Sequence, residues 1–339
     1  MVINSICDPA LFDEALFENS FYLPALAMTL QDMTHNHIQV LDSAGVIGGE
    51  VKGKLQCAPQ CQLLYNALLR PERIVRVPAD NALAEKIAEW REAGSASAAA
   101  CSAHSLVDVL IADTDTQIAI KEAGLDIRKT CSIQQYPASG WKKKKMDTEK
   151  AFPIGGMSKV DFVEQVIRPV VRCAKKVTII DKIAIKAAFG DDRNPSGNPS
   201  GSWESFRKSI YAVYDEWTKG LYQGIGTFEV ITWPVTHVQN AGKSMLGDDL
   251  AEEFGRRLGI SFKQLRVMFK REHSFREDMH DRYLITNQGF VLGFSKGFDL
   301  SSAAAMSVCD VYFRHHDNLI ARLMSKTGQC GLLDQQSGR

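Results

Sequence analysis

Four acidic residues in the first third of the chain are candidates for metal-dependent chemistry: Asp8, Glu50, Asp108 and Asp113. Asp8 follows the short apolar segment 4–7, while Asp108 and Asp113 flank the apolar segment 109–112. Carboxylates at strand ends can converge at the carboxyl edge of an α/β sheet. Converging carboxylates need a divalent cation, Mg²⁺ or Mn²⁺, to relieve their repulsion, and such an ion could activate water against a phosphodiester.

The same acids have a plainer interpretation. Asp often begins a turn or a helix after a strand, because its side chain accepts hydrogen bonds from nearby backbone N–H groups. Asp8, Asp80 and Asp113 could all serve only as caps of this kind. The sequence leaves both interpretations open.

A second group of residues with chemical potential lies near the C-terminus. His280 and Arg282 are two positions apart, so on a strand their side chains point to the same face. This pairing suits a phosphodiester centre, because the imidazole can attack phosphorus or move a proton while the cation binds phosphate oxygens. Ser295 and Lys296 could join the anion site, and Asn287 completes the candidate catalytic residues.

The segment His280-Asp281-Arg282-Tyr283 resembles the His-x-Lys motif of the phospholipase D superfamily. This segment, the Gly-x-x-x-Gly-Phe-Asp turn at 293–299 and the Asp-terminated strand 177–181 together resemble one kind of domain more specifically. It is the phospholipase-D-like domain found at the C-terminus of MIT-domain proteins and in bacterial relatives. The resemblance covers roughly residues 160–325.

Two departures from the active motif bear on catalysis. Arg282 stands where an active enzyme has Lys, and Asn287 stands where it has Asp. Arg binds phosphate but does not readily lose its proton, and Asn cannot act as a carboxylate. The chain holds no second His-x-Lys or His-x-Arg strand, so an active site would need a homodimer through this domain. The relatives of the MIT type are binding domains, which implies a non-catalytic module for a protein partner or an anionic lipid as the alternative.

The N-terminal acids carry a second resemblance. Val109-Leu110-Ile111-Ala112-Asp113 is similar to the "valine-leucine-x-x-Asp" pattern of PIN-type metal-dependent ribonucleases, whose first strand also ends in Asp, as Asp8 does here. The resemblance covers residues 1–135 and implies that Asp8, Glu50 and Asp113 hold Mg²⁺ or Mn²⁺. Neither Asp80 nor Asp108 matches the usual place of the third acid.

Strand and helix patterns alternate along the chain and must position these residues. Strands are predicted at 4–7, 38–41, 107–112, 131–133, 176–181, 228–232, 265–269, 283–286 and 290–294, and helices at 58–69, 81–92, 116–123, 158–173, 203–221 and 250–259. Residues 287–289 form a hairpin turn between the last two strands. The alternation predicts an α/β protein. The two resemblances imply a PIN-like three-layer domain at 1–140 and a phospholipase-D-like α/β sandwich at 158–330, with a basic linker at 141–157 between them.

Composition limits the classes of function. The chain has 339 residues, 40 basic and 40 acidic side chains, and therefore no net charge, so it is not a generic polyanion binder. Any contact with nucleic acid must use a local patch. Eight scattered cysteines, no secretory signal and no apolar stretch long enough to form a transmembrane segment predict a cytoplasmic protein with reduced thiols.

The two resemblances together imply a prokaryotic, nuclease-type protein that cleaves phosphodiesters, of a phage-defence or toxin system. Nucleic acid and a partner protein of a multi-gene system are the expected binding partners. The alternative is a catalytically inactive phospholipase-D-like module that forms a homodimer and binds a protein or an anionic lipid.

Overall fold

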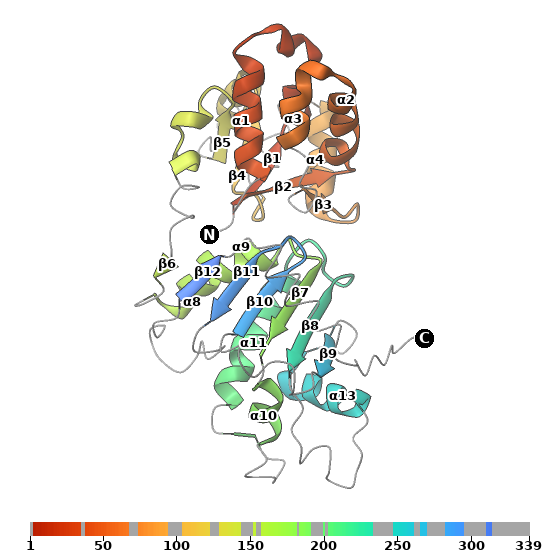
Figure 1. Ribbon diagram of the computed structural model, residues 1–339, viewed down its shortest axis with the longest axis vertical. Coiled ribbons are helices and arrows are strands. Elements are labelled where there is room, and N and C mark those ends of the chain that lie inside the picture. The colour runs from red at the N-terminus through yellow and green to blue at the C-terminus, as the bar shows by residue number, and fades with distance from the viewer. Residues whose placement is uncertain are drawn as a thin grey trace. The chain divides into compact units, whose positions relative to one another are not determined.

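The computed structural model divides into two compact units, Met1–Lys150 (unit 1) and Ala151–Arg339 (unit 2) (Figure 1). It describes residues 3–34, 38–67, 74–93, 104–122, 129–143, 152–153, 157–181, 183–190, 199–200, 203–232, 247–260, 265–269, 282–294 and 310–313. Each unit has its own sheet, which confirms the prediction of an α/β protein with two sheets. Among the described helices, none is long and apolar enough to cross a membrane.

Unit 1 is built on a parallel sheet of five strands in the order β3-β2-β1-β4-β5. The strands are β1 (Ile3–Cys7), β2 (Ile38–Ser43), β3 (Ile74–Val77), β4 (Val109–Ala112) and β5 (Thr130–Ser132). The chain runs outward from β1 through β2 to β3 and then returns to β4 on the other side of β1. The direction of winding therefore reverses between β1 and β4, which makes this pair the topological switch point of the sheet.

Helices cover both faces of this sheet (Figure 1). They are η1 (Pro9–Phe12), η2 (Glu14–Glu18), α1 (Tyr22–Thr34), η3 (Val46–Val51), α2 (Lys52–Cys57), η4 (Pro59–Cys61), α3 (Gln62–Ala67), α4 (Ala82–Ala93), α6 (Thr114–Glu122) and η8 (Tyr136–Ala138). Alternate strand residues such as Val40 and Ile111 join one buried cluster with α1, α2 and α3. Leu41 and Leu110 point to the opposite face, where α4 packs against β2.

Unit 1 includes the beginning of the predicted linker. Tyr136 is buried in the apolar cluster, and the partly buried Trp141 packs against the cluster. The Lys142 ammonium forms an ion pair with the Asp32 carboxylate on α1. The first residues of the segment expected to be linker are therefore fastened to unit 1, and the boundary between the units falls later within 141–157.

Unit 2 contains a mixed sheet of seven strands in the order β6-β12-β11-β10-β7-β8-β9. The strands are β6 (Phe152–Pro153), β7 (Lys176–Ile180), β8 (Thr227–Thr232), β9 (Leu265–Phe269), β10 (Arg282–Thr286), β11 (Val291–Phe294) and β12 (Asp310–Phe313). β7, β8 and β9 are parallel, while β10 pairs antiparallel with both β7 and β11. The predicted hairpin is present, and Gly289 at its turn has φ of 79°. Glycine adopts this left-handed conformation without steric cost.

The helices of unit 2 pack on the sheet through aromatic side chains. They are α8 (Lys159–Phe162), η9 (Val163–Ile167), α9 (Arg168–Val171), α10 (Ala184–Phe189), α11 (Trp203–Thr218) and α13 (Gly247–Leu258). On α11, the rings of Tyr214 and Trp217 lie 5.4 and 5.7 Å from that of Phe228 on β8. The Trp217 indole also donates a hydrogen bond of 2.8 Å to the Ala174 carbonyl, so its polar atom is satisfied in the core.

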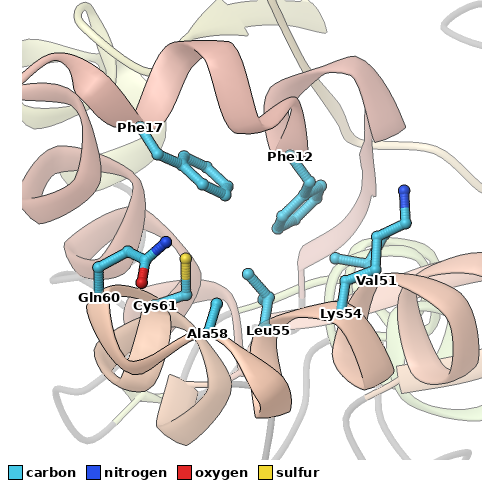
Figure 2. Close-up of a pocket in the computed structure, with 8 residues that line it drawn as sticks. All are labelled: Phe12, Phe17, Val51, Lys54, Leu55, Ala58, Gln60 and Cys61. Atoms are coloured by element: carbon cyan, nitrogen blue, oxygen red, sulfur yellow. The ribbon is translucent and has the colours of Figure 1, made fainter.

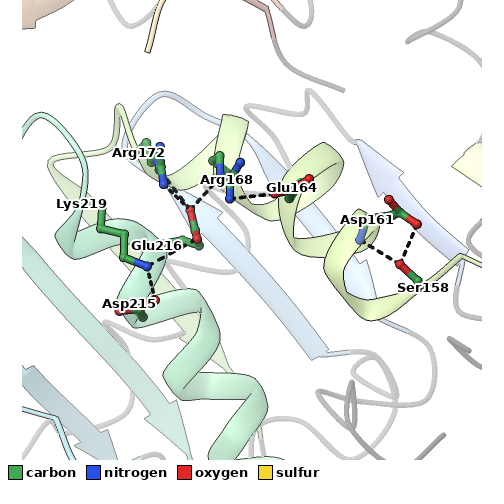
Figure 3. A network of polar contacts seen from close by, with 8 residues as sticks. All are labelled: Ser158, Asp161, Glu164, Arg168, Arg172, Asp215, Glu216 and Lys219. Atoms are coloured by element: carbon green, nitrogen blue, oxygen red, sulfur yellow. Dashed lines mark hydrogen bonds and ion pairs between the residues drawn. The ribbon is translucent and has the colours of Figure 1, made fainter. Parts of the chain in front are cut away.

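A buried carboxylate joins α9 to α11 (Figure 3). Glu216 Oε2 accepts hydrogen bonds from the Nε atoms of Arg168 and Arg172, each at 3.0 Å. The Glu216 side chain is 7% exposed, whereas that of Glu164, which pairs with Arg168 at 3.3 Å, is 48% exposed. One acid between two cations therefore holds the two helices together away from water.

Candidate functional site

Two of the predicted acids meet at the switch point of unit 1. Cys7 ends β1 opposite Ile111 of β4, and the Asp8 N–H continues the ladder with a bond of 2.8 Å to the Ile111 carbonyl. Asp113 follows the last residue of β4. Asp8 and Asp113, which we call the acid pair, thus directly follow the carboxyl ends of adjacent parallel strands. In open α/β sheets, ligands bind at this place.

Thr116 connects the two members of the acid pair. Asp113 Oδ1 accepts a hydrogen bond of 2.6 Å from the Thr116 N–H at the start of α6. The Thr116 hydroxyl donates to Asp8 Oδ2 at 3.4 Å. Asp8 Oδ1 accepts from the Ala10 N–H at 2.9 Å and caps η1. The capping roles foreseen for both acids are therefore real, and they leave each carboxylate fixed at the sheet edge.

Burial and mutual repulsion make negative charge costly at this edge. Burial raises the pKa of the Asp8 carboxyl, and the charge of Asp113 raises it further, against the lowering effect of the Ala10 N–H. Burial, with smaller effects from Asp8 and Asp42, raises the pKa of the Cys7 thiol to about 12. The pKa of the Tyr22 hydroxyl is raised by burial and then by Cys7 and the acid pair. A bound cation would favour the charged form of the Asp8 carboxyl.

The other predicted metal ligands lie elsewhere. Asp108 precedes β4 and accepts a hydrogen bond of 2.9 Å from the Asn4 N–H. It lies at the amino edge of the sheet, at the other end of the strand from Asp113, so it is not part of the acid pair. Glu50 is an exposed residue of η3. Asp80 does not cap α4, because the side-chain Oδ1 of Asn81 accepts a hydrogen bond of 2.9 Å from the Leu83 N–H in its place.

The acid pair fits one kind of metal site and not another. Within the residues that the structure describes, no group of three or more His, Cys, Asp or Glu side chains could hold a metal ion. A closed protein cage is thus not formed there. Mg²⁺, however, is commonly held by one or two carboxylates together with water and substrate phosphates. The two carboxylates fit Mg²⁺ or Mn²⁺ in that mode.

In unit 2, the candidate cation Arg282 already faces an acid. The antiparallel register of β7 and β10 places Arg282 opposite Asp181, and Arg282 Nε lies 3.5 Å from Asp181 Oδ2. The Asp181 carboxylate is buried, and its Oδ1 accepts a hydrogen bond of 2.8 Å from the Ile183 N–H. Much of the Arg282 charge is thus compensated within the protein.

Asn287 lies at the opposite end of β10 from Arg282. The side-chain oxygen of Asn287 accepts a hydrogen bond of 2.9 Å from the Lys176 backbone N–H, and the Asn287 backbone N–H donates one of 3.1 Å to the Lys176 carbonyl. These bonds set the register of β10 on β7, so Asn287 does not join Arg282 in one anion site. The remaining members of the predicted group, His280, Ser295 and Lys296, lie outside the described residues.

A small pocket opens in unit 1 beside the segments that follow β1 and β2 (Figure 2). Its volume is about 90 Å³. Phe12 and Phe17 form one wall, with Leu55 and Cys61 opposite, and Lys54 and Gln60 lie toward its two ends. No sequence motif indicated this pocket, because its walls come from five short helical segments that are adjacent only after folding.

Thr116 is a further functional candidate that the sequence patterns did not reveal, and they also did not reveal the pairing of Asp181 with Arg282. Thr116 is an ordinary first-turn residue of α6, and only its contact with Asp8 gives it a role. Asp181 was visible as the acid that ends β7, but its partner Arg282 depends on a strand pairing that one sequence does not specify.

Comparison with known proteins gives no match. No protein-family model matches the chain, no curated protein is similar to it, and no solved structure matches its fold. Function must therefore be inferred from the sites themselves.

Proposed function

We propose that the chain is a metal-dependent, nuclease-type phosphodiesterase whose reaction centre is the acid pair Asp8 and Asp113. The observation that carries the proposal is a buried carboxylate whose pKa is raised by burial and by a second carboxylate, at the switch point of a parallel sheet. Structural ion pairs would bring opposite charges together, whereas this site brings like charges together. The resemblance of the same two residues to the acids of PIN-type ribonucleases supports it independently.

The residues of the chain have separate tasks in this proposal. The acid pair would hold Mg²⁺ or Mn²⁺, which supplies a nucleophile at neutral pH by acidifying water. Thr116 positions the Asp8 carboxylate, and the α6 N-cap bond holds Asp113. In this proposal, hydrolysis would join a water oxygen to phosphorus, break the bond from phosphorus to the leaving sugar oxygen, and transfer a proton from that water to the sugar oxygen.

The test is cleavage of labelled single- and double-stranded RNA and DNA by the purified chain, with Mn²⁺ and with EDTA. We expect Asp8→Asn and Asp113→Asn to lose on the order of a hundredfold or more in rate, because several kcal/mol of transition-state stabilisation depend on the ion. Asp108→Asn is the matched control, since this acid lies at the other edge of the same sheet and should keep full activity.

Binding of the ion has its own readout. Mn²⁺ should raise the midpoint of thermal unfolding for the native chain and Asp108→Asn, and not for Asp8→Asn. Equal shifts in all three proteins, or cleavage that survives Asp8→Asn, would show that the acid pair is not the centre.

A second candidate function belongs to unit 2. The compensation of Arg282 by the buried Asp181 favours a non-catalytic module there, which would form a homodimer and bind a partner protein or an anionic lipid. In the same assay, His280→Ala would leave cleavage unchanged if this interpretation holds. Cleavage that persists in EDTA and is lost in His280→Ala would instead assign phospholipase-D-type chemistry to unit 2.

We extend the first proposal to its biological setting. A nuclease-type unit 1 joined to a binding unit 2 suits a cytoplasmic prokaryotic defence or toxin protein, in which unit 2 brings a partner protein to the nuclease. This setting rests on the two sequence resemblances together and not on the acid pair alone.

A further inference from the structure

The pocket of unit 1 is directly connected to the acid pair through the backbone. Asp8 caps η1, and the last residue of η1 is Phe12, which forms part of the pocket wall. Four residues of 3₁₀ helix span about 8 Å at 2.0 Å per residue. The opposite wall comes from α2 and η4, which follow β2 from the same carboxyl edge of the sheet. A molecule in the pocket would thus lie close to the proposed reaction centre.

The lining of the pocket combines flat aromatic surface with polar ends (Figure 2). The rings of Phe12 and Phe17 provide surfaces on which a planar group can stack, and Leu55 closes the other side. Lys54 and Gln60 are exposed side chains toward the two ends. The Lys54 ammonium can donate to phosphate oxygens, while the Gln60 amide can both donate to and accept from the edge of a base.

The size of the pocket limits what it admits. A closed cavity of roughly 150 Å³ takes up benzene, whereas this pocket has about 90 Å³ and is open to water. A six-membered ring can therefore enter edge first and only in part. A purine would leave its second ring outside.

From this lining and size, we propose that the pocket seats one pyrimidine base of a single-stranded nucleic acid, with Phe17 stacking on the base and Lys54 contacting an adjacent phosphate. Stacking on an aromatic side chain requires an unpaired base, so a duplex would not be held. This inference rests on the proposed nuclease function and names its substrate class.

The test measures binding of fluorescein-labelled oligo(U), oligo(A), oligo(dT) and oligo(dA) to the full chain by fluorescence anisotropy in EDTA, where no metal-dependent cleavage occurs. The pyrimidine strands should bind more tightly than the purine strands. Phe17→Leu keeps an apolar side chain but removes the ring, and it should weaken pyrimidine binding roughly tenfold. Phe17→Tyr should restore the affinity, which a merely structural role for the ring would not require.

A variant of the exposed Lys54 tests whether its positive charge contributes to binding of the oligonucleotides. Lys54→Gln should weaken binding of every oligonucleotide and reduce the dependence of affinity on salt, because one phosphate contact is lost. Lys121→Gln changes an exposed lysine at the end of α6 and serves as the control that should bind like the native chain. Because Lys54 is exposed, its variant carries the test even if Phe17→Leu folds poorly.

The outcomes separate the two proposals. Equal affinity for pyrimidine and purine strands, or native affinity in both Phe17→Leu and Lys54→Gln, overturns the base pocket while leaving cleavage at the acid pair untouched. Binding as expected in a chain that shows no Mn²⁺-dependent cleavage supports the base pocket and overturns the proposed catalytic function.

Discussion

Burial and the nearby Asp113 disfavour the charged form of the Asp8 carboxyl, and this affects the free energy of unfolding. Burial and then Asp113 raise the pKa of its carboxyl above the ordinary value of 3.8, so the folded chain holds the proton more tightly than the unfolded chain. The free energy of unfolding therefore falls as the pH rises from that value through the raised pKa, and it stays lowered above it.

Asp8→Asn should consequently be more stable than the native chain at neutral pH in the absence of metal. The amide has no charge to bury, and its oxygen can still accept from the Ala10 N–H. The difference in free energy of unfolding between Asp8→Asn and the native chain should shrink as the pH falls toward about 4. This pH is near the ordinary pKa of Asp, and the native Asp8 carboxyl is protonated there. Urea unfolding in EDTA across this range provides the measurement.

Asp113→Asn gives the internal control for this effect. With Asp113 already neutral, the gain from Asp8→Asn should be smaller, and the difference is the coupling between the two carboxylates. A gain that does not vary with pH, or one that is independent of Asp113, would contradict the charge repulsion described here.

At this scale, the sequence predicted that Asp8 and Asp113 lie at one edge of the sheet, and the structure shows both there. Asp8 and Asp113 were identified because each follows an apolar strand, and parallel strands bring their carboxyl ends to one edge. Asp108 was included for its nearness to the same strand, although a residue that precedes a parallel strand must lie at the opposite edge. Arg282 was read as a phosphate ligand because its partner Asp181 lies about a hundred residues away and is brought close only by antiparallel pairing.

Among the elements, the contact of α9 with α11 depends on one acid more than on any other polar group in Figure 3. Glu216→Gln removes the buried counter-charge that the guanidinium groups of Arg168 and Arg172 share, and it leaves Arg168 with its surface pair to Glu164. We expect a loss of about 2–3 kcal/mol in the free energy of unfolding, at the lower end for a broken buried pair because Arg168 is 34% exposed.

Glu164→Gln is the matched control for that change. It removes an ion pair with the same Arg168, but on the surface, where such pairs contribute about 0.5 kcal/mol or less. Denaturant unfolding compares the two variants. Equal losses would mean that the burial of Glu216 does not decide the strength of its contacts.

Long, strongly patterned elements were the most predictable. β9 was predicted at its observed bounds, and the hairpin of β10 and β11 was found through its turn residues. The helix at 158–173 is present as the consecutive segments α8, η9 and α9. α1 and β3 were not predicted. β3 has only four residues, which is too short for its alternation to stand out.

At the scale of the whole molecule, unit 1 has its own sheet and its own buried apolar cluster. Its sheet, its buried cluster and the closing contact of Lys142 with Asp32 lie within residues 1–150. A fragment of residues 1–150 should therefore fold alone, with cooperative urea unfolding followed by far-ultraviolet circular dichroism.

A fragment of residues 1–135 is the comparison. It keeps every strand of the sheet but lacks Tyr136, Trp141 and Lys142, so part of the apolar cluster is uncovered. Its unfolding midpoint should lie at a clearly lower urea concentration. Equal midpoints would show that these three side chains contribute nothing to unit 1, and an unfolded 1–150 fragment would show that unit 2 is required.

The order of strands in unit 1 also determines when the acid pair can form during synthesis of the chain. Asp8 leaves the ribosome early, but its partner Thr116 lies 108 residues later in the chain. At a translation rate of 5–20 residues per second, that gap lasts roughly 5 to 20 s. Through this interval β1 has no neighbour on the β4 side, and the acid pair does not exist. Under the proposed nuclease function, a nascent chain that stalls before β4 emerges would lack the reaction centre and would leave the RNA around it intact.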